Sequence, residues 1–221
     1  MIAAVVVLAV VAVLSGAITR RRIRRLEFWW HRSRDCGAVV FVGDSITQLW
    51  SDLAGAFPNW KVANRGLNGD HSTDVLRRLP ADVEPLRPRA VVLLVGSNDL
   101  DQGIDPGVVL ANLRAIVSAL RADSPRLPVA VCKIMPRGEA GGVFTARARD
   151  LNSRIDAEFS REPAMAVVDT WTPFADGNGA PRPEDFPDHV HPGPSGYDKW
   201  AAAVKPILTR WDADGTIQSA K

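Results

Sequence analysis

The sequence predicts a three-layer α/β/α domain built on a doubly wound sheet of about five parallel strands. Three observations support this prediction. Short apolar runs recur along the chain without the alternation of a half-exposed strand, as parallel strands covered on both faces require. Amphipathic stretches with helical spacing separate these runs. Polar turns that contain glycine follow the first three runs, where an open parallel sheet binds its ligand.

Five apolar segments are expected to form the strands. They span residues 38–43, 60–66, 90–96, 129–135 and 165–169. Helices are predicted within residues 72–79, 105–123 and 144–159, and a last helix from about Ser195 to Trp211. The globular domain is therefore expected to span residues 36–212, and residues 213–221 form a polar tail.

Composition excludes several classes of protein. The 221 residues are 46% hydrophobic with a net charge of +2, which fits one globular domain with a proper core. Much of the basic excess lies in an arginine-rich block near the N-terminus. No nucleic-acid partner is predicted, because phosphate binding needs a basic face on the folded domain. Two cysteines cannot form a framework of disulfides, so both are interpreted as unpaired.

The N-terminal segment predicts membrane anchoring. Residues 1–19 carry no charged side chain, and at about 1.5 Å per helical residue they nearly span a hydrocarbon core of about 30 Å. The competing interpretation is a signal peptide, since Ser15-Gly16-Ala17 resembles a cleavage site. A single-pass anchor is favoured because no basic residue precedes the run. Residues 20–35 are interpreted as a basic linker whose arginines favour a cytoplasmic domain, with export as the alternative.

Candidate catalytic residues lie in the polar turns and near the end of the chain. A serine becomes nucleophilic when a base takes its proton, and that base needs an orienting acid. Ser45 follows the first strand, and Asp188 and His191 stand three residues apart, so their side chains can face the same way. Candidate oxyanion donors are the backbone N–H groups of Ser45 and Gly69 and the side-chain amide of Asn98.

Each of these residues also has a structural interpretation. Ser45 could cap a helix, Asn98 could occupy a tight turn, and His191 could be a surface histidine. The catalytic interpretation is favoured because every structural interpretation would otherwise have to be true at the same time, for residues at strand ends that share one edge of the sheet.

Four sequence blocks carry a family resemblance. "GDSIT" (43–47), "NRGLNGD" (64–70), "GSNDL" (96–100) and "DHVHP" (188–192) resemble, in order, the four blocks of the SGNH (GDSL-type) hydrolases. The segment "GYDKWAAAVKPIL" resembles the C-terminal helix of bacterial members related to platelet-activating-factor acetylhydrolase subunits.

The resemblance implies a flavodoxin-like sheet and no metal or organic cofactor. It also implies Ser45 as nucleophile, His191 as general base and Asp188 as its orienting acid. Ser45, Gly69 and Asn98 would supply the oxyanion hole.

The predicted function is a serine esterase that forms an acyl-enzyme. Its expected substrates are carboxylic esters, with short acyl or acetyl groups on a lipid, glycan or small alcohol. One alternative is an acyltransferase that acts on a glycan or alcohol acceptor. Another is a membrane-tethered binding module without turnover.

Overall fold

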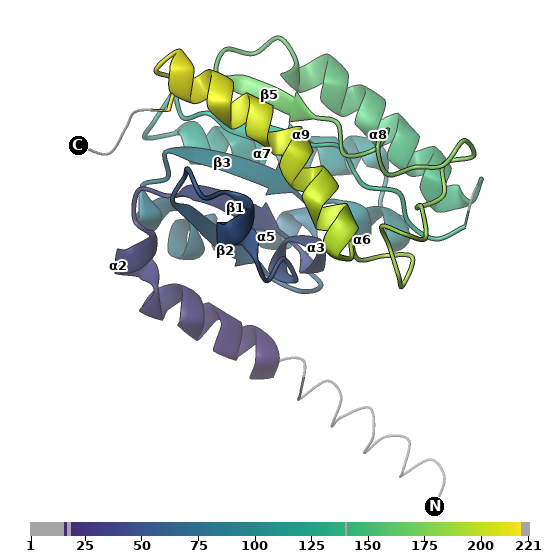
Figure 1. Ribbon diagram of the computed structural model, residues 1–221, viewed down its shortest axis with the longest axis horizontal. Coiled ribbons are helices and arrows are strands. Elements are labelled where there is room, and N and C mark those ends of the chain that lie inside the picture. Colours follow the sequence, from purple (N-terminus) through teal and green to yellow (C-terminus); the bar gives the residue numbers. More distant parts are fainter. Residues whose placement is uncertain (1–15, 17–18, 140, 218–221) are drawn as a thin grey trace, which may run out of the picture.

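The computed structural model describes residues 16, 19–139 and 141–217, which contain one five-stranded sheet (Figure 1). Its strands are β1 (Val39–Gly43), β2 (Val62–Gly66), β3 (Ala90–Leu94), β4 (Val129–Cys132) and β5 (Met165–Val168). All neighbours pair in parallel, in the order β2-β1-β3-β4-β5. This is the strand order of flavodoxin-like folds. The predicted doubly wound sheet of five parallel strands is confirmed.

The strand order places a topological switch point beside β1. The chain winds from β1 outward to β2 on one side, and then returns to β3 on the other. Gly43, the last residue of β1, is in register with Gly66 of β2 and Leu94 of β3. The turns after these three strands therefore leave the sheet at the same level, where doubly wound folds bind ligands.

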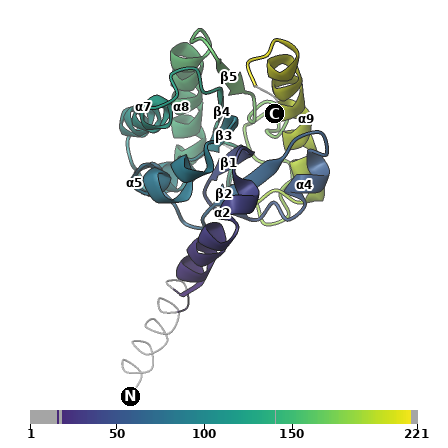
Figure 2. The ribbon, with the colours of Figure 1, turned by 90° about the vertical axis from the view of Figure 1, so that its left-hand side faces the viewer.

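Helices cover both faces of the sheet (Figure 2). One face carries α5 (Ser72–Asp82), α7 (Pro106–Arg121) and α8 (Val143–Phe159). The other carries α9 (Pro194–Ala213) with the short helices α3 (Ser45–Gln48) and α4 (Leu53–Ala56). The remaining short elements are α2 (Arg32–Asp35), η1 (Glu84–Leu86) and α6 (Ser97–Asp101).

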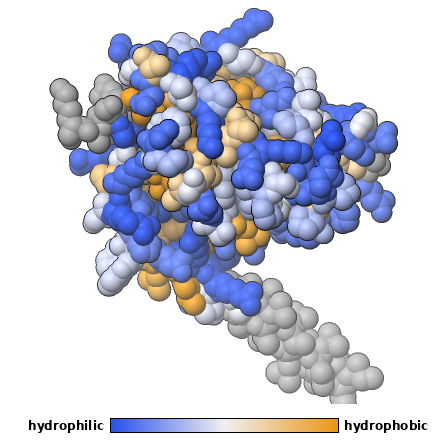
Figure 3. All heavy atoms as spheres, in the orientation of Figure 1, coloured by the Kyte–Doolittle hydropathy of each residue, from blue (hydrophilic) through white to orange (hydrophobic). Residues whose placement is uncertain are grey.

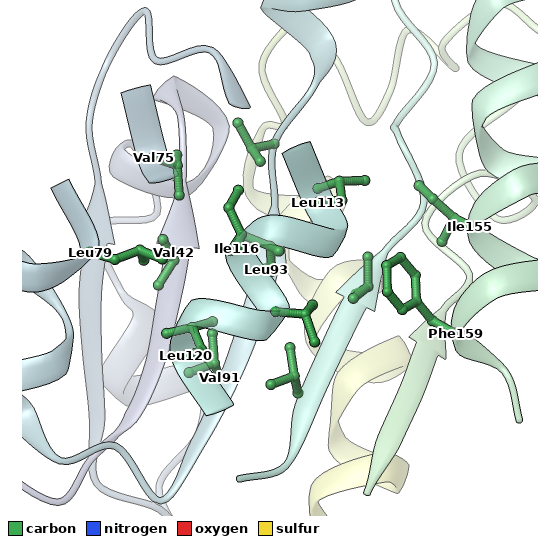
Figure 4. Close-up of a cluster of buried hydrophobic side chains, with 14 of the residues drawn as sticks. Val42, Val75, Leu79, Val91, Leu93, Leu113, Ile116, Leu120, Ile155 and Phe159 are labelled. Carbon is green, nitrogen blue, oxygen red and sulfur yellow. The ribbon is translucent and has the colours of Figure 1, made fainter. Parts of the chain in front are cut away.

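Burial on both faces explains the unbroken apolar runs. All five residues of β1 are buried, with Val40 and Val42 in the core on the α7 side and Val39 and Phe41 in the core on the α9 side. In Figure 4, side chains of α5, α7 and α8 converge on those of the sheet. Full burial of one such aliphatic side chain contributes about 1.5–3 kcal/mol. A strand between two helical layers therefore has no position that favours a polar residue.

Aromatic side chains join α9 to the turn that follows β1. Trp200 of α9 is fully buried, and its ring centroid lies 4.7 Å from that of Trp50 and 6.3 Å from that of Phe41. Tyr197 stacks on Trp50 with a centroid distance of 5.1 Å. These large contacts hold the start of α9 beside the end of β1.

The segment predicted as a basic linker is helical and lies against the domain. Residues 19–30 form a helix that continues into α2 after a turn at His31. Phe28 on this helix is buried, and the Arg25 guanidinium lies 3.1 Å from the Asp82 carboxylate of α5. The outward side of the helix exposes large apolar side chains, namely Ile23, Leu26, Trp29 and Trp30.

The predicted membrane helix, residues 1–19, lies outside the described residues except for Gly16 and Thr19. It stays a prediction. In the part of the chain that the structure describes, no helix combines the length and apolar content needed to cross a bilayer. The face of the molecule seen in Figure 3 is mainly hydrophilic, with small apolar patches.

Candidate active site

The turn after β1 presents Ser45 at the switch point. A Cβ on Gly43 would lie 2.2 Å from the Leu94 carbonyl oxygen, so only glycine lets β1 end this close to β3. The Asp44 carboxylate then accepts a hydrogen bond from the Ile46 N–H at 2.9 Å and caps α3. Ser45 is therefore the first residue of the helix, and it keeps 9% of its surface exposed.

Asp44 is buried directly beneath this turn. Burial raises the pKa of its carboxyl to about 7, although the Ile46 N–H favours the charged form. The folded pKa lies above the ordinary value of 3.8, so the protonated carboxyl stabilises the fold fully below about pH 3.8, and this contribution is lost as the pH rises to about 7. The contacts of Asp44 indicate that it holds the turn.

Ser45, His191 and Asp188 form an unbroken hydrogen-bonded series. The Ser45 Oγ lies 2.9 Å from the His191 Nε2, although the two residues are 146 positions apart in the chain. The His191 Nδ1 lies 2.7 Å from the Asp188 Oδ2. With Nδ1 protonated and bonded to the carboxylate, Nε2 is left as the acceptor for the serine proton.

A tight turn holds the Asp188 carboxylate against the imidazole. The Asp188 Oδ1 accepts hydrogen bonds from the backbone N–H groups of Val190 at 2.9 Å and His191 at 2.6 Å. His189 adopts the left-handed conformation, with φ of 63°, and its side chain is exposed.

The same contacts keep Asp188 charged. Partial burial alone would raise its pKa, but hydrogen bonds from His191 and Val190 lower it to about 2. The carboxylate therefore stays ionised until the pH falls towards about 2, far below neutral pH.

Tyr197 ties the helix that follows His191 to the helix that carries Ser45. Its hydroxyl donates to the Ile46 carbonyl oxygen at 2.9 Å, and burial raises its pKa. This contact was not predicted from the sequence. The available signal was composition, because Tyr197 is the one tyrosine of the chain and stands six residues after His191.

The structure separates the roles of two nearby glycines. A Cβ on Gly66 would lie 2.2 Å from the Gln48 backbone nitrogen, so this glycine lets β2 pack against α3. Gly69 has a φ of +75°, and a Cβ there would meet one atom within 4 Å, the Nη1 of Arg21 at 3.7 Å. Gly69 is therefore required by its backbone conformation rather than by close packing.

Asn98 connects the turn after β3 to the loop that contains Gly69. Its Nδ2 donates to the Asp70 carbonyl oxygen at 2.9 Å. The amide carries two N–H groups, so one hydrogen remains for another acceptor. Asp99, on the same short helix as Asn98, binds the start of α5, because its carboxylate accepts hydrogen bonds from the backbone N–H and the hydroxyl of Ser72.

A buried arginine organises these turns and was missed in the sequence. Arg78 of α5 is 5% exposed, and its guanidinium donates to the Asp70 carboxylate at 2.6 Å. It also donates to the carbonyl oxygens of Gly43 at 3.1 Å and Arg65 at 2.8 Å. The available signal was its spacing, because Arg78 stands three residues after Val75 on the apolar side of the helix. Arg78 thus links the ends of β1 and β2 to the Gly69 loop.

A hydroxyl, an imidazole and a carboxylate in series are typical of hydrolases that use a serine nucleophile. Here they lie at the switch point of a doubly wound sheet. The model of the GDSL-like Lipase/Acylhydrolase family matches residues 41–199, a range that contains this series together with Gly69 and Asn98. The chain belongs to this family, as the resemblance of its four sequence blocks indicated, and is a carboxylic ester hydrolase.

Individual relatives agree with this assignment. The chain is 27% identical over 168 residues to platelet-activating factor acetylhydrolase IB subunit alpha2 of Gallus gallus, covering 73% of this chain and 71% of the relative. It is 25% identical over 183 residues to Esterase TesA of Pseudomonas aeruginosa, covering 77% and 87%. The crystal structure of a GDSL-like lipase from Bacteroides thetaiotaomicron superposes with a TM-score of 0.70 and 26% identity, covering 80% and 90%.

Proposed function

We propose that the protein hydrolyses its esters through an acyl-enzyme on Ser45, with His191 as general base and Asp188 as the acid that orients it. The observation that carries this proposal is the hydrogen-bonded series from the Ser45 Oγ to the His191 Nε2 at 2.9 Å and from the His191 Nδ1 to the Asp188 Oδ2 at 2.7 Å. The contacts of Tyr197 and Arg78 support it, because they fix the end of β1 and the start of α3, which carries Ser45, and join α3 to the helix that follows His191.

The proposed reaction has two halves. In the first, the His191 Nε2 removes the Ser45 proton while the Oγ attacks the ester carbonyl carbon, and the imidazolium then protonates the departing alcohol. In the second, His191 takes a proton from water, the resulting hydroxide attacks the acyl-enzyme, and the proton returns to the Ser45 Oγ as the acid leaves. Asp188 stays ionised throughout and stabilises the imidazolium.

Each half passes through a tetrahedral oxyanion, for which we propose three donors. They are the backbone N–H groups of Ser45 and Gly69 and the amide of Asn98. The first stands at the start of α3, and Asn98 is hydrogen-bonded to the loop that carries Gly69. Donors on rigid turns are already oriented when charge develops, which is why such groups lower the barrier.

Asn98→Ala is expected to lower kcat about a hundredfold or more while KM changes little. Loss of one oxyanion donor typically has an effect of this size. Steady-state kinetics on a p-nitrophenyl ester would measure it, with circular dichroism as a check of the fold. Gln102→Ala, a change at an exposed position just after α6, is the matched control and should keep wild-type kcat. An Asn98→Ala enzyme with unchanged kcat would remove this residue from the mechanism.

The proposed substrates carry short acyl groups on a lipid, glycan or small alcohol. The chicken relative supports this choice, since its name describes an acetylhydrolase. We expect kcat/KM for p-nitrophenyl esters to be highest for acetate and to fall as the acyl chain lengthens. A maximum at eight carbons or more would contradict the short-acyl proposal. Product analysis with and without an added alcohol distinguishes hydrolysis from acyl transfer, because a transferase would form the new ester.

A further inference from the structure

We propose that Arg21, on the N-terminal helix, is a positioning residue for this reaction, because it holds the Asn68–Gly69 peptide group so that the Gly69 N–H faces the oxyanion. The inference rests on the proposed function, in which that N–H is an oxyanion donor. It gives the helix formed by residues 19–30 a part in catalysis, although this helix precedes the first strand and carries no residue of the proposed triad.

Arg21 binds the Gly69 loop from both sides of the glycine. One nitrogen of its guanidinium donates to the Asn68 carbonyl oxygen, and the other lies 2.6 Å from the Asp70 carboxylate. The planar guanidinium fork can contact both acceptors at once. Gly69 is thus held between two points that one arginine side chain fixes.

The geometry of the peptide bond transmits this contact to the proposed donor. The Asn68 C=O and the Gly69 N–H belong to one planar, trans peptide group, so they point in opposite directions. A cation that fixes the carbonyl oxygen on one side therefore fixes the direction of the N–H on the other. A charged donor on the oxygen also polarises the amide, which strengthens the N–H as a donor.

The hydrogen bonds of this loop leave one N–H group for a ligand. The N–H of Leu67 donates to the Gly43 carbonyl at 3.0 Å, that of Asn68 to the Gln48 side chain at 2.7 Å, and that of Asp70 to the Leu67 carbonyl at 3.1 Å. Within the described residues, no hydrogen bond donated by the Gly69 N–H is found. Its neighbours hold the loop, and the remaining N–H is available to an oxyanion.

Arg21 shares the Asp70 carboxylate with Arg78, an arginine buried in the domain. The Asp70 carboxylate is fully buried, and Arg78 contacts its other oxygen from within the domain at 2.6 Å. The Arg21 side chain is 35% exposed. Removal of Arg21 does not leave a buried charge unpaired, because Arg78 stays bound to the Asp70 carboxylate, and water partly screens the charge of Arg21 itself. The loss of Arg21 should therefore affect the orientation of the loop far more than the stability of the fold.

The test compares two arginines of the same helix in the full-length protein. Arg21→Ala is expected to lower kcat about tenfold with KM within about twofold. A misdirected oxyanion donor should lower kcat less than complete removal of a donor does. Phosphonylation of Ser45 by a fluorophosphonate should slow by a similar factor, since its transition state also places negative charge on oxygen. Arg25→Ala removes the ion pair with Asp82 but leaves the Gly69 loop untouched, and should keep wild-type kcat.

Three results would overturn the proposal. The first is an Arg21→Ala enzyme with kcat within twofold of wild type. The second is an equal loss of kcat in Arg25→Ala, which would attribute the effect to docking of the helix as a whole. The third concerns Arg21→Lys, which keeps the charge but lacks the planar fork. This variant should recover part of the kcat that Arg21→Ala loses. A lysine variant without any recovery would count against the proposal, even if Arg21→Ala folds poorly. Failure of the proposed function looks different, because wild type and Ser45→Ala would then hydrolyse esters equally.

Discussion

Ser45→Ala is expected to lower kcat for ester hydrolysis by about five to six orders of magnitude and to leave the fold intact. The substitution removes the oxygen that would form the acyl-enzyme. It changes a small side chain that is 9% exposed, at a position where alanine suits the helix. The His191 ring that loses its partner is 30% exposed, so its Nε2 can bond to water and no buried polar group is left unpaired.

The measurement combines steady-state kinetics with covalent labelling. A fluorophosphonate should label the wild-type enzyme at Ser45 and should leave Ser45→Ala unlabelled. Ser33→Ala, at an exposed position on α2, is the matched control and should behave as wild type in both assays. Residual activity above about one per cent in Ser45→Ala would show that another group is the nucleophile.

His191→Ala is expected to cause a loss of similar size, and the double variant Ser45→Ala/His191→Ala should be no worse than either single variant. Groups that act as one unit are not additive, because removal of either one abolishes the step in which both take part. The distance of 2.9 Å between the Ser45 Oγ and the His191 Nε2 is the physical basis for this expectation. Steady-state kinetics of the three variants, with enough enzyme to detect slow turnover, would test it.

His189→Asn is the matched control for His191. It removes an exposed imidazole from the same turn, and asparagine tolerates the left-handed conformation that His189 adopts at a φ of 63°. Activity within about twofold of wild type is expected. Losses that multiply in the double variant would mean that Ser45 and His191 act in separate steps, which would contradict the proposed mechanism.

The fold could be predicted largely from local patterns. A run such as residues 38–43 is apolar at every position because helices cover both faces of its strand, and the structure confirms this for β1. Part of the candidate site could also be predicted from the sequence, because the carboxyl ends of parallel strands lie at one edge of the sheet. Ser45, Gly69 and Asn98 follow β1, β2 and β3, and the order of the strands brings those turns together.

Other parts of the site could not be predicted in this way. Residues 20–35 have the composition of a solvated basic linker, yet residues 19–30 form a helix whose arginines bind Asp70 and Asp82. Arg78 has the charge of a surface residue, yet it is buried, where two carbonyl oxygens and a carboxylate accept hydrogen bonds from its guanidinium. The pairing of charged groups depends on which elements meet in space, and no local period of the sequence encodes it.

The sequence by itself determined the α/β class, the approximate strands and the residue types available for acyl chemistry, because burial and helical period are properties of short segments. The tertiary structure decided that Ser45 and His191 meet across 146 residues, and that Tyr197, Arg78 and Arg21 hold the surrounding turns. Such contacts depend on the packing of α9, α5 and the N-terminal helix around one end of the sheet. Packing is a property of the whole chain, so these contacts are visible only once the chain has folded.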